Sequence, residues 1–252
     1  MRVRAGWAAV VAVLFPAVAG AETYVRVGAG FEASRHVGLS DADCSSVAPP
    51  AVFGCARAMD GEPLSARGHY GRGPLAEFGL GRRIAPYARL ELTGTWRPDL
   101  DFRGRANFLR TPGPQPVRAQ GSSLAVLATA YYDFGQYGRL RPFVGFGAGV
   151  ARNRMGEVRY AFPGLPGGDA ATVTPGGVRS SLAWSASAGL AWSLSDRAIL
   201  DVSYRYTNLG EVRARPGEAQ VVRAGGTRQI VVAATRAKLE VEGVAASVRW
   251  AF

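Results

Sequence analysis

The feature of this sequence that most constrains its fold is a strict alternation of apolar and polar residues along segments of about ten residues. In the segment YARLELTGTW (87–96), Leu90, Leu92 and Trp96 share one face of an extended chain, and polar side chains occupy the other. A period of two belongs to β-strands whose two faces meet different surroundings. No apolar run approaches the roughly 20 residues that a membrane-spanning helix needs. The sequence therefore predicts an all-β protein.

The same alternation predicts eight strands. They cover residues 23–33, 73–82, 87–96, 121–134, 141–151, 181–194, 197–207 and 238–252. Their length suits a tilted strand that crosses a bilayer. In the last strand the apolar residues change face near Gly243, and this change predicts a β-bulge there.

The connections between these strands alternate in length. Those after the second, fourth and sixth strands are short, whereas those after the odd-numbered strands run to roughly 25 to 40 residues. This asymmetry is typical of short periplasmic turns and four long extracellular loops. Aromatic residues such as Trp96, Trp184 and Trp250 lie near strand ends on the apolar face, as in the two aromatic belts of membrane proteins. We therefore expect an eight-stranded antiparallel transmembrane up-and-down β-barrel.

The N-terminal segment predicts export through a cleaved signal peptide over residues 1–21. Arg2 and Arg4 precede a short apolar stretch that ends in the small residues of a cleavage site. The mature barrel domain is then expected to cover residues 22–252 and to lie in the bacterial outer membrane.

The first long loop holds both cysteines of the chain, Cys44 and Cys55. In an oxidising compartment these two residues are expected to form a disulfide. A bond that closes so short a loop stabilises by about 2–3 kcal/mol. The loop then serves either as a recognition surface or as a protective staple, and both alternatives stay open.

Three segments resemble the opacity-type family of eight-stranded outer-membrane β-barrel proteins. They are RPFVGFGAGVARN (141–153), LDVSYRYTNLGEV (200–212) and VAASVRWAF (244–252). The resemblance implies that Phe252 is part of an assembly signal that the barrel-assembly machinery reads. It also implies a surface role, and the adhesive members of the family suggest an extracellular polyanion or a host surface as partner.

The inner face of the predicted barrel carries equal numbers of basic and acidic residues. These are Arg26, Arg89, Arg205 and Arg249 with Glu32, Glu77, Glu91 and Asp201. An eight-stranded barrel is narrow enough for side chains to fill, and buried charges persist only when they are paired. We therefore expect a plug of ion pairs. The alternative is a small-solute or ion porin.

Arginine dominates the later loops. The connections after the third, fifth and seventh strands hold 14 arginines, Arg97 among them, and six acidic residues. Guanidinium groups suit phosphate and sulfate, so lipopolysaccharide is the expected partner, whereas nucleic acid is not expected in this compartment. The candidate polyanion-binding residues are Arg103, Arg105, Arg110, Arg152, Arg154, Arg213, Arg215 and Arg223.

The sequence offers little for catalysis. Its two histidines, His36 and His69, lie in or beside the first loop, and nucleophile-elbow, zinc and phosphate-loop motifs are missing. We therefore expect no enzyme, cofactor or metal, and a monomeric barrel. A lipid A-modifying enzyme remains an alternative, and it would require one of these histidines to lie beside a serine and a carboxylate.

Overall fold

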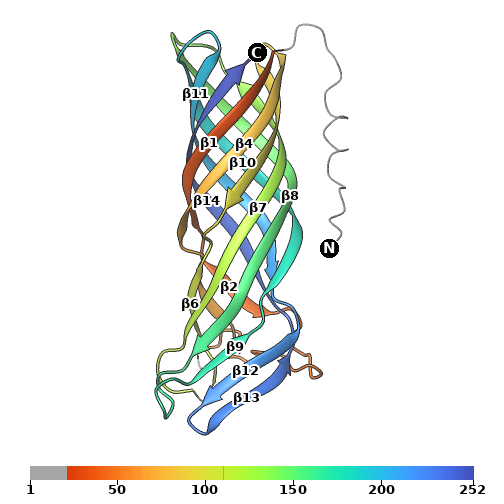
Figure 1. Cartoon of the computed structure of the whole chain (residues 1–252), viewed down its shortest axis with the longest axis vertical. Coiled ribbons are helices and arrows are strands. Elements are labelled where there is room, and N and C mark those ends of the chain that lie inside the picture. The colour runs from red at the N-terminus through yellow and green to blue at the C-terminus, as the bar shows by residue number, and fades with distance from the viewer. Residues whose placement is uncertain (1–21, 59, 110) are drawn as a thin grey trace, which may run out of the picture.

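The structure, a computed structural model, describes residues 22–58, 60–109 and 111–252. The predicted export signal at 1–21 lies outside these residues. Each of eight long strands is antiparallel to its neighbours, and the first closes against the last (Figure 1). They are β1 (Thr23–Ser34), β4 (Arg72–Ala85), β5 (Ala88–Arg97), β7 (Pro116–Asp133), β8 (Leu140–Ala161), β10 (Gly177–Ser193), β11 (Ala198–Arg213) and β14 (Thr235–Ala251). The expected eight-stranded antiparallel barrel is confirmed. Among the described residues, no helix is long and apolar enough to cross a membrane.

Further strands continue the barrel wall beyond this ring. Three of them are β2 (Val37–Asp41), β3 (Ala66–His69) and β6 (Phe102–Ala106). Strand β2 pairs with β14 and β3, and β6 pairs with β3 and β7. These three strands therefore take the place of β1, β4 and β5 between β14 and β7. We call the eight-stranded barrel around β1, β4 and β5 the membrane ring, and the closed ring that contains β2, β3 and β6 the outer ring.

A hairpin extends from the outer ring. Strand β9 (Ala171–Thr174) pairs with β8, and β12 (Gly217–Arg223) joins β9 to β13 (Gly226–Val232). In Figure 1 these three strands lie at the end opposite to the C-terminus. The long connections predicted as loops thus contain six strands. Their own period-two patterns, such as FRGRA at 102–106, are short and rich in Arg and Gly, so they are easily taken for loop sequence.

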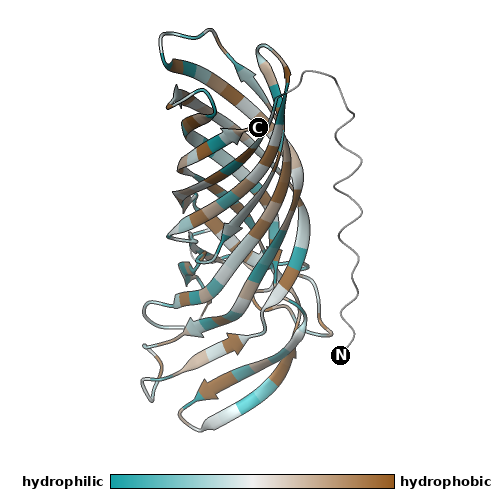
Figure 2. Cartoon of the chain, turned by 45° about the horizontal axis from the view of Figure 1, so that its top comes forward, coloured by the Kyte–Doolittle hydropathy of each residue, from teal (hydrophilic) through white to brown (hydrophobic). Residues whose placement is uncertain are grey.

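The outside of the membrane ring is apolar. Phe31, Phe78 and Leu182 are 72%, 60% and 84% exposed, a degree of exposure that suits contact with lipid. Trp192 and Trp250 are exposed near the short turns, at the level of an aromatic belt. Figure 2 shows hydrophobic and hydrophilic residues alternating along the barrel strands.

The predicted bulge at Gly243 is wrong. Strand β14 keeps regular register through Gly243 against both β1 and β11. The irregularity lies in β11 between Asn208 and Glu211. On β14, Val241 points inward and is fully buried, whereas Val244 is 52% exposed on the outside. The two faces therefore alternate without a break, and what changes is the interior, which becomes apolar in the outer ring.

This apolar interior joins side chains from most strands of the outer ring. Its fully buried members include Leu39, Phe102, Val117, Val158, Tyr160, Leu209, Val212 and Leu239. Burial raises the pKa of Tyr160 above its ordinary value, because the apolar surroundings disfavour the charged phenolate. The outer ring is thus built like a water-soluble barrel, with its apolar residues inside.

The first connection forms a lid on this core. The Asp41 carboxylate accepts three backbone N–H groups from residues 52–54, at 2.8, 2.9 and 2.8 Å. Phe53 stacks on Phe108 with 5.0 Å between ring centroids. The Cys44–Cys55 disulfide, confirmed in the structure, closes the same segment. Of the two alternatives for this loop, the buried Phe53 favours a staple that seals the core.

Candidate functional site

The structure places all eight predicted ion-pair residues inside the membrane ring. Each is at most 7% exposed. Arg26 binds Glu77 and Glu91, the second at 3.0 Å, and it also donates to the Tyr131 hydroxyl at 2.9 Å. Glu77 accepts a second ion pair from Arg205 at 2.6 Å. These pairs join β1, β4, β5 and β11 across the lumen.

Two further pairs extend the network toward the short turns. Arg89 lies 3.1 Å from Asp133, and its guanidinium is 4.0 Å from the centre of the Tyr131 ring. Arg249 donates to both oxygens of Asp201, at 2.5 and 2.9 Å. Charge-assisted, partly bidentate bonds of this kind hold buried ions in fixed positions.

The sequence places Arg97 among the arginines of the connection after the third strand, and the structure corrects this placement. Arg97 ends β5 with its side chain inside the barrel, 2% exposed, and it pairs with Glu32 at 2.6 Å. It follows Trp96 in the alternation and therefore faces inward. With Arg97 and Asp133 included, five arginines and five carboxylates of the described residues face each other in the lumen. The interior is electrically balanced and filled by large side chains.

On the outside of the outer ring, three arginines stand in one row. Arg103 on β6 lies opposite Arg118 on β7, and Arg118 lies opposite Arg159 on β8. All three are exposed, and among the described residues no carboxylate lies within 4.0 Å of their nitrogens. Like charges directly opposite each other destabilise a sheet. We call Arg103, Arg118 and Arg159 the arginine row.

Two candidate arginines lie nearer the membrane. Arg152 and Arg154 point outward from β8, and Leu124, which belongs to the apolar outer face, is the register partner of Arg152. They therefore mark the boundary between the apolar belt and the arginine row.

The remaining candidates are dispersed. Arg105 is exposed next to the row, opposite Arg67. Arg213 and Arg215 are exposed near the outer end of β11. Arg223 packs 5.1 Å from the Phe162 ring centre and donates to a backbone carbonyl at 3.0 Å, so it supports the hairpin. Arg110 lies outside the described residues.

The candidate list misses two members of the arginine row, Arg118 and Arg159. The local sequences VRAQ and VRY alternate, with valine inward and arginine outward. This alternation could have placed both arginines on the outer face. Their alignment with Arg103 depends on strand register, which the sequence does not display.

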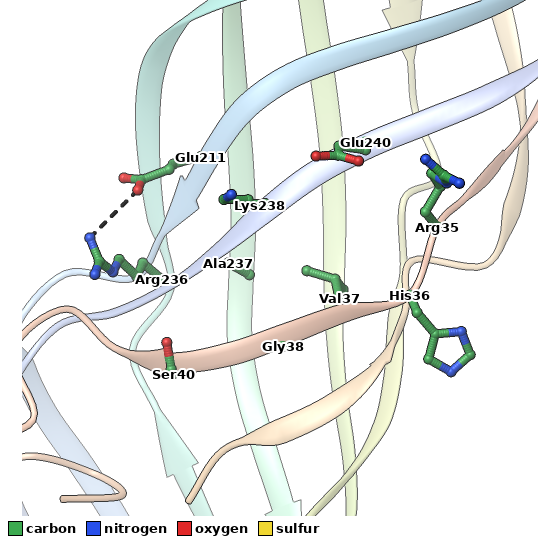
Figure 3. A pocket seen from close by; sticks show the side chains of 10 residues that line it. All are labelled: Arg35, His36, Val37, Gly38, Ser40, Glu211, Arg236, Ala237, Lys238 and Glu240. Atoms are coloured by element: carbon green, nitrogen blue, oxygen red, sulfur yellow. Dashed lines mark ion pairs between the residues drawn. The ribbon is translucent and has the colours of Figure 1, made fainter. Parts of the chain in front are cut away.

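A groove lies at the waist, where β14 passes from pairing with β1 to pairing with β2 (Figure 3). Its volume is about 400 Å³. Arg236 points toward Glu211 at 3.7 Å, and Arg35 lies 6.0 Å from the Tyr206 ring centre. Lys238, the one lysine of the chain, lies between them in the groove without a carboxylate within 4.0 Å among the described residues. The groove is thus lined by three basic residues, Arg35, Arg236 and Lys238, and by two acidic ones, Glu211 and Glu240.

The two histidines come together beside this groove. His36 and His69 have ring centroids 6.4 Å apart and line a 640 Å³ pocket with Ser34, Asp99 and Asp101. The Ser34 hydroxyl accepts the Tyr70 N–H at 2.5 Å, and the His69 Nδ1 accepts the Gly71 N–H at 3.0 Å. The structure shows no hydrogen bond between a histidine and Ser34, which a nucleophile and its base require. The described residues contain no group of three or more metal-ligating side chains suited to an ion.

Comparisons with known proteins agree with the fold. No family model matches the chain. The chain is 26% identical over 152 residues to outer membrane protein PagN of Salmonella typhimurium, and the match spans 60% of this chain and 62% of PagN. The outer membrane protease OmpT of Escherichia coli has a similar β-barrel fold, with a TM-score of 0.50, 8% identity, and coverage of 92% of this chain and 97% of OmpT. Neisserial surface protein A matches with a TM-score of 0.41, 18% identity, and coverage of 92% and 99%. The closed ring of eight strands and its apolar exterior show a transmembrane β-barrel of the kind found in the bacterial outer membrane, and the similarities to PagN and OmpT agree with this fold.

Proposed function

We propose that this protein binds phosphorylated lipopolysaccharide along the outside of its outer ring, with the arginine row as the principal contact. The observation that carries the proposal is the register of Arg103, Arg118 and Arg159 on three neighbouring strands without a carboxylate within 4.0 Å. The three arginines project from neighbouring strands whose backbones lie about 5 Å apart. A row of anionic groups would relieve their repulsion and accept their forked hydrogen bonds.

The height of the row supports lipopolysaccharide as the ligand. Arg118 lies six residues beyond Leu124 on β7, or about 20 Å along the strand. With the usual strand tilt, this places the row roughly 15 Å above the apolar belt. Phosphates attached to the saccharides of lipopolysaccharide lie above the acyl chains, whereas Arg152 and Arg154 lie closer to the lipid boundary.

The test removes the row without disturbing the rest of the barrel. We expect the triple variant Arg103→Gln, Arg118→Gln, Arg159→Gln to bind lipopolysaccharide at least tenfold more weakly than the wild type at low salt. This loss should shrink as salt rises, because screening weakens the wild-type contact. Titration of the refolded barrel with fluorescent lipopolysaccharide would measure both effects.

A matched variant separates placement from total charge. Arg139, Arg141 and Arg197 lie at the short turns, at the opposite end of the barrel, and replacing all three by Gln removes the same charge. This control should bind like the wild type.

Equal losses in both variants would contradict a localised site. Undiminished binding of dephosphorylated lipopolysaccharide would contradict recognition of phosphate, and exclusive binding of a sulfated polysaccharide would favour the adhesive alternative.

The arrangement of the two histidines supports a binding role over an enzymatic one. The Ser34 hydroxyl oxygen and the His69 Nδ1 each accept a backbone N–H. A base that already accepts one N–H and lies beside no nucleophile is poorly placed for acyl transfer. We therefore propose a non-enzymatic surface protein.

We also propose that the barrel-assembly machinery reads the last strand through Phe252. Phe252 is 72% exposed beside β14, and its N–H donates to the Thr23 carbonyl at 3.1 Å. Deletion of Phe252 is expected to lower the yield of assembled barrel several-fold while export continues. Phe252→Tyr keeps an aromatic ring and should assemble normally. Heat-modifiable mobility of the protein in outer-membrane fractions measures the yield, and normal assembly of the deletion variant would refute the proposed signal.

A further inference from the structure

The hairpin of β12 and β13 ends in an open edge. Among the strands of the described residues, β13 alone has a single neighbour, because every other strand is paired on both sides. Residues 226–231 are all exposed, including Ile230 at 37% and Val231 at 51%. A barrel normally abolishes free edges, and the edges that remain in proteins are usually protected by lysine, proline or a bulge. The β13 sequence GTRQIVV contains one charged residue, Arg228, and no lysine or proline, and its pairing with β12 is regular.

The direction of the free backbone groups follows from the hairpin register. Arg223 pairs with Gly226 across a two-residue turn, and the pair that closes such a turn is hydrogen-bonded. Bonded and non-bonded pairs then alternate along the strand. Arg228 and Ile230 therefore bond to β12, whereas the N–H and C=O groups of Thr227, Gln229 and Val231 point to the open edge.

We propose that β13 pairs with β13 of a second copy of this chain, antiparallel and centred on Gln229. This register brings the open backbone groups of residues 227, 229 and 231 opposite one another, and it places Arg228 of each copy beside Ile230 of the other. A register centred on Arg228 would place two arginines face to face, which a sheet disfavours. The strand is therefore self-complementary in one particular register.

The side chains support the same register. Gln220 on β12 is already the partner of Gln229 on β13. Pairing two hairpins about Gln229 aligns four glutamines across four strands, and ladders of amide side chains can donate and accept along such a row. In the neighbouring row, Thr227 lies beside Val231 of the second copy, a pairing of two residues that favour strands. The proposed dimer differs from the monomer expected from the sequence, and it does not depend on polyanion binding.

The test uses a substitution that blocks the edge while sparing the hairpin. Gln229→Pro removes an N–H that points to the open edge, so the bonds between β12 and β13 remain, and proline is tolerated at an edge. We expect the wild-type barrel to show concentration-dependent dimers in density-matched detergent by sedimentation equilibrium. Gln229→Pro should abolish these dimers.

Two further variants distinguish the backbone N–H of residue 229 from its side chain as the cause of any loss of dimers. Gln229→Ala keeps the backbone N–H and should still dimerise, with at most a modest weakening. Gln229→Lys brings two ammonium groups together and should dimerise only at high salt. Amide hydrogen exchange in the dimer should slow at residues 227, 229 and 231 more than at 226 and 228. A wild type that stays monomeric over the accessible concentration range, or a dimer that survives Gln229→Pro, would overturn the proposal.

Discussion

The membrane ring and the outer ring place apolar and charged side chains on opposite faces of the barrel wall. In the membrane ring, apolar side chains such as Phe31 face outward and charged side chains such as Arg89 are buried. In the outer ring, apolar side chains such as Leu239 are buried, and arginines such as Arg118 face outward. The same strands, β7, β8, β10, β11 and β14, run through both rings. The medium outside the wall therefore decides the chemistry of each face: lipid excludes charge, whereas water and saccharide admit it.

The inversion also explains where binding can occur. The lumen of the membrane ring satisfies its charges internally, through pairs such as Arg249 with Asp201. The arginine row on the outer ring lacks carboxylate partners within 4.0 Å in the described part of the chain. Paired charges inside the barrel hold the wall together, whereas unpaired charges outside are available to a ligand.

The largest expected effect is a loss of stability when a buried charge of the membrane ring is removed. Arg89→Leu leaves Asp133 without its ion-pair partner, whereas Glu91 keeps Arg26 at 3.0 Å. A buried carboxylate that loses its ion pair destabilises by about 3–5 kcal/mol. Urea unfolding in lipid vesicles would measure the loss. The double variant Arg89→Leu, Asp133→Leu also removes the unpaired carboxylate and should recover part of the stability. An unchanged unfolding midpoint for Arg89→Leu would show that water reaches the lumen.

A smaller effect is expected when the outer ring loses apolar volume. Leu239→Ala opens a cavity in the buried core and should destabilise the barrel by about 2–5 kcal/mol. Val244→Ala lies on the same strand but on the exposed outer face, where the truncation creates no buried cavity. Comparing the two variants by the same unfolding measurement tests whether the inner and outer faces of β14 differ in this way. Equal effects would mean that the faces are not chemically distinct.

The smallest expected effect is the ion conductance of the barrel, because an ion would have to pass through both rings. The ion-paired lumen and the apolar core lie in series, so we expect only rare and small openings in planar bilayers, with circular dichroism confirming a β fold. Arg97→Ala with Glu32→Ala removes an ion pair on the inner face at the end of β5 and should not open the barrel, because the core above it remains. Steady ion-selective openings of the wild type would favour the porin alternative.

Strand number and facing could largely be predicted from the sequence. The alternation places Arg26, Glu77 and Asp201 inside, and the structure has them there. The same alternation runs through Arg103, Arg118 and Arg159, but it belongs to segments rich in Arg and Gly that were interpreted as loops. The change of face near Gly243 was interpreted as a bulge, whereas it records the passage from lipid to water along one straight strand.

The sequence by itself determined the eight membrane strands, their two faces and the cysteine pair, because alternation and spacing are local properties of the chain. Only the tertiary structure decided which charges pair, as with Arg205 and Glu77, which lie 128 residues apart. It also decided that three arginines align in one row and that β13 keeps an open edge. Such features depend on the register and closure of strands distant in sequence, and long-range register is fixed by the packing of the whole barrel.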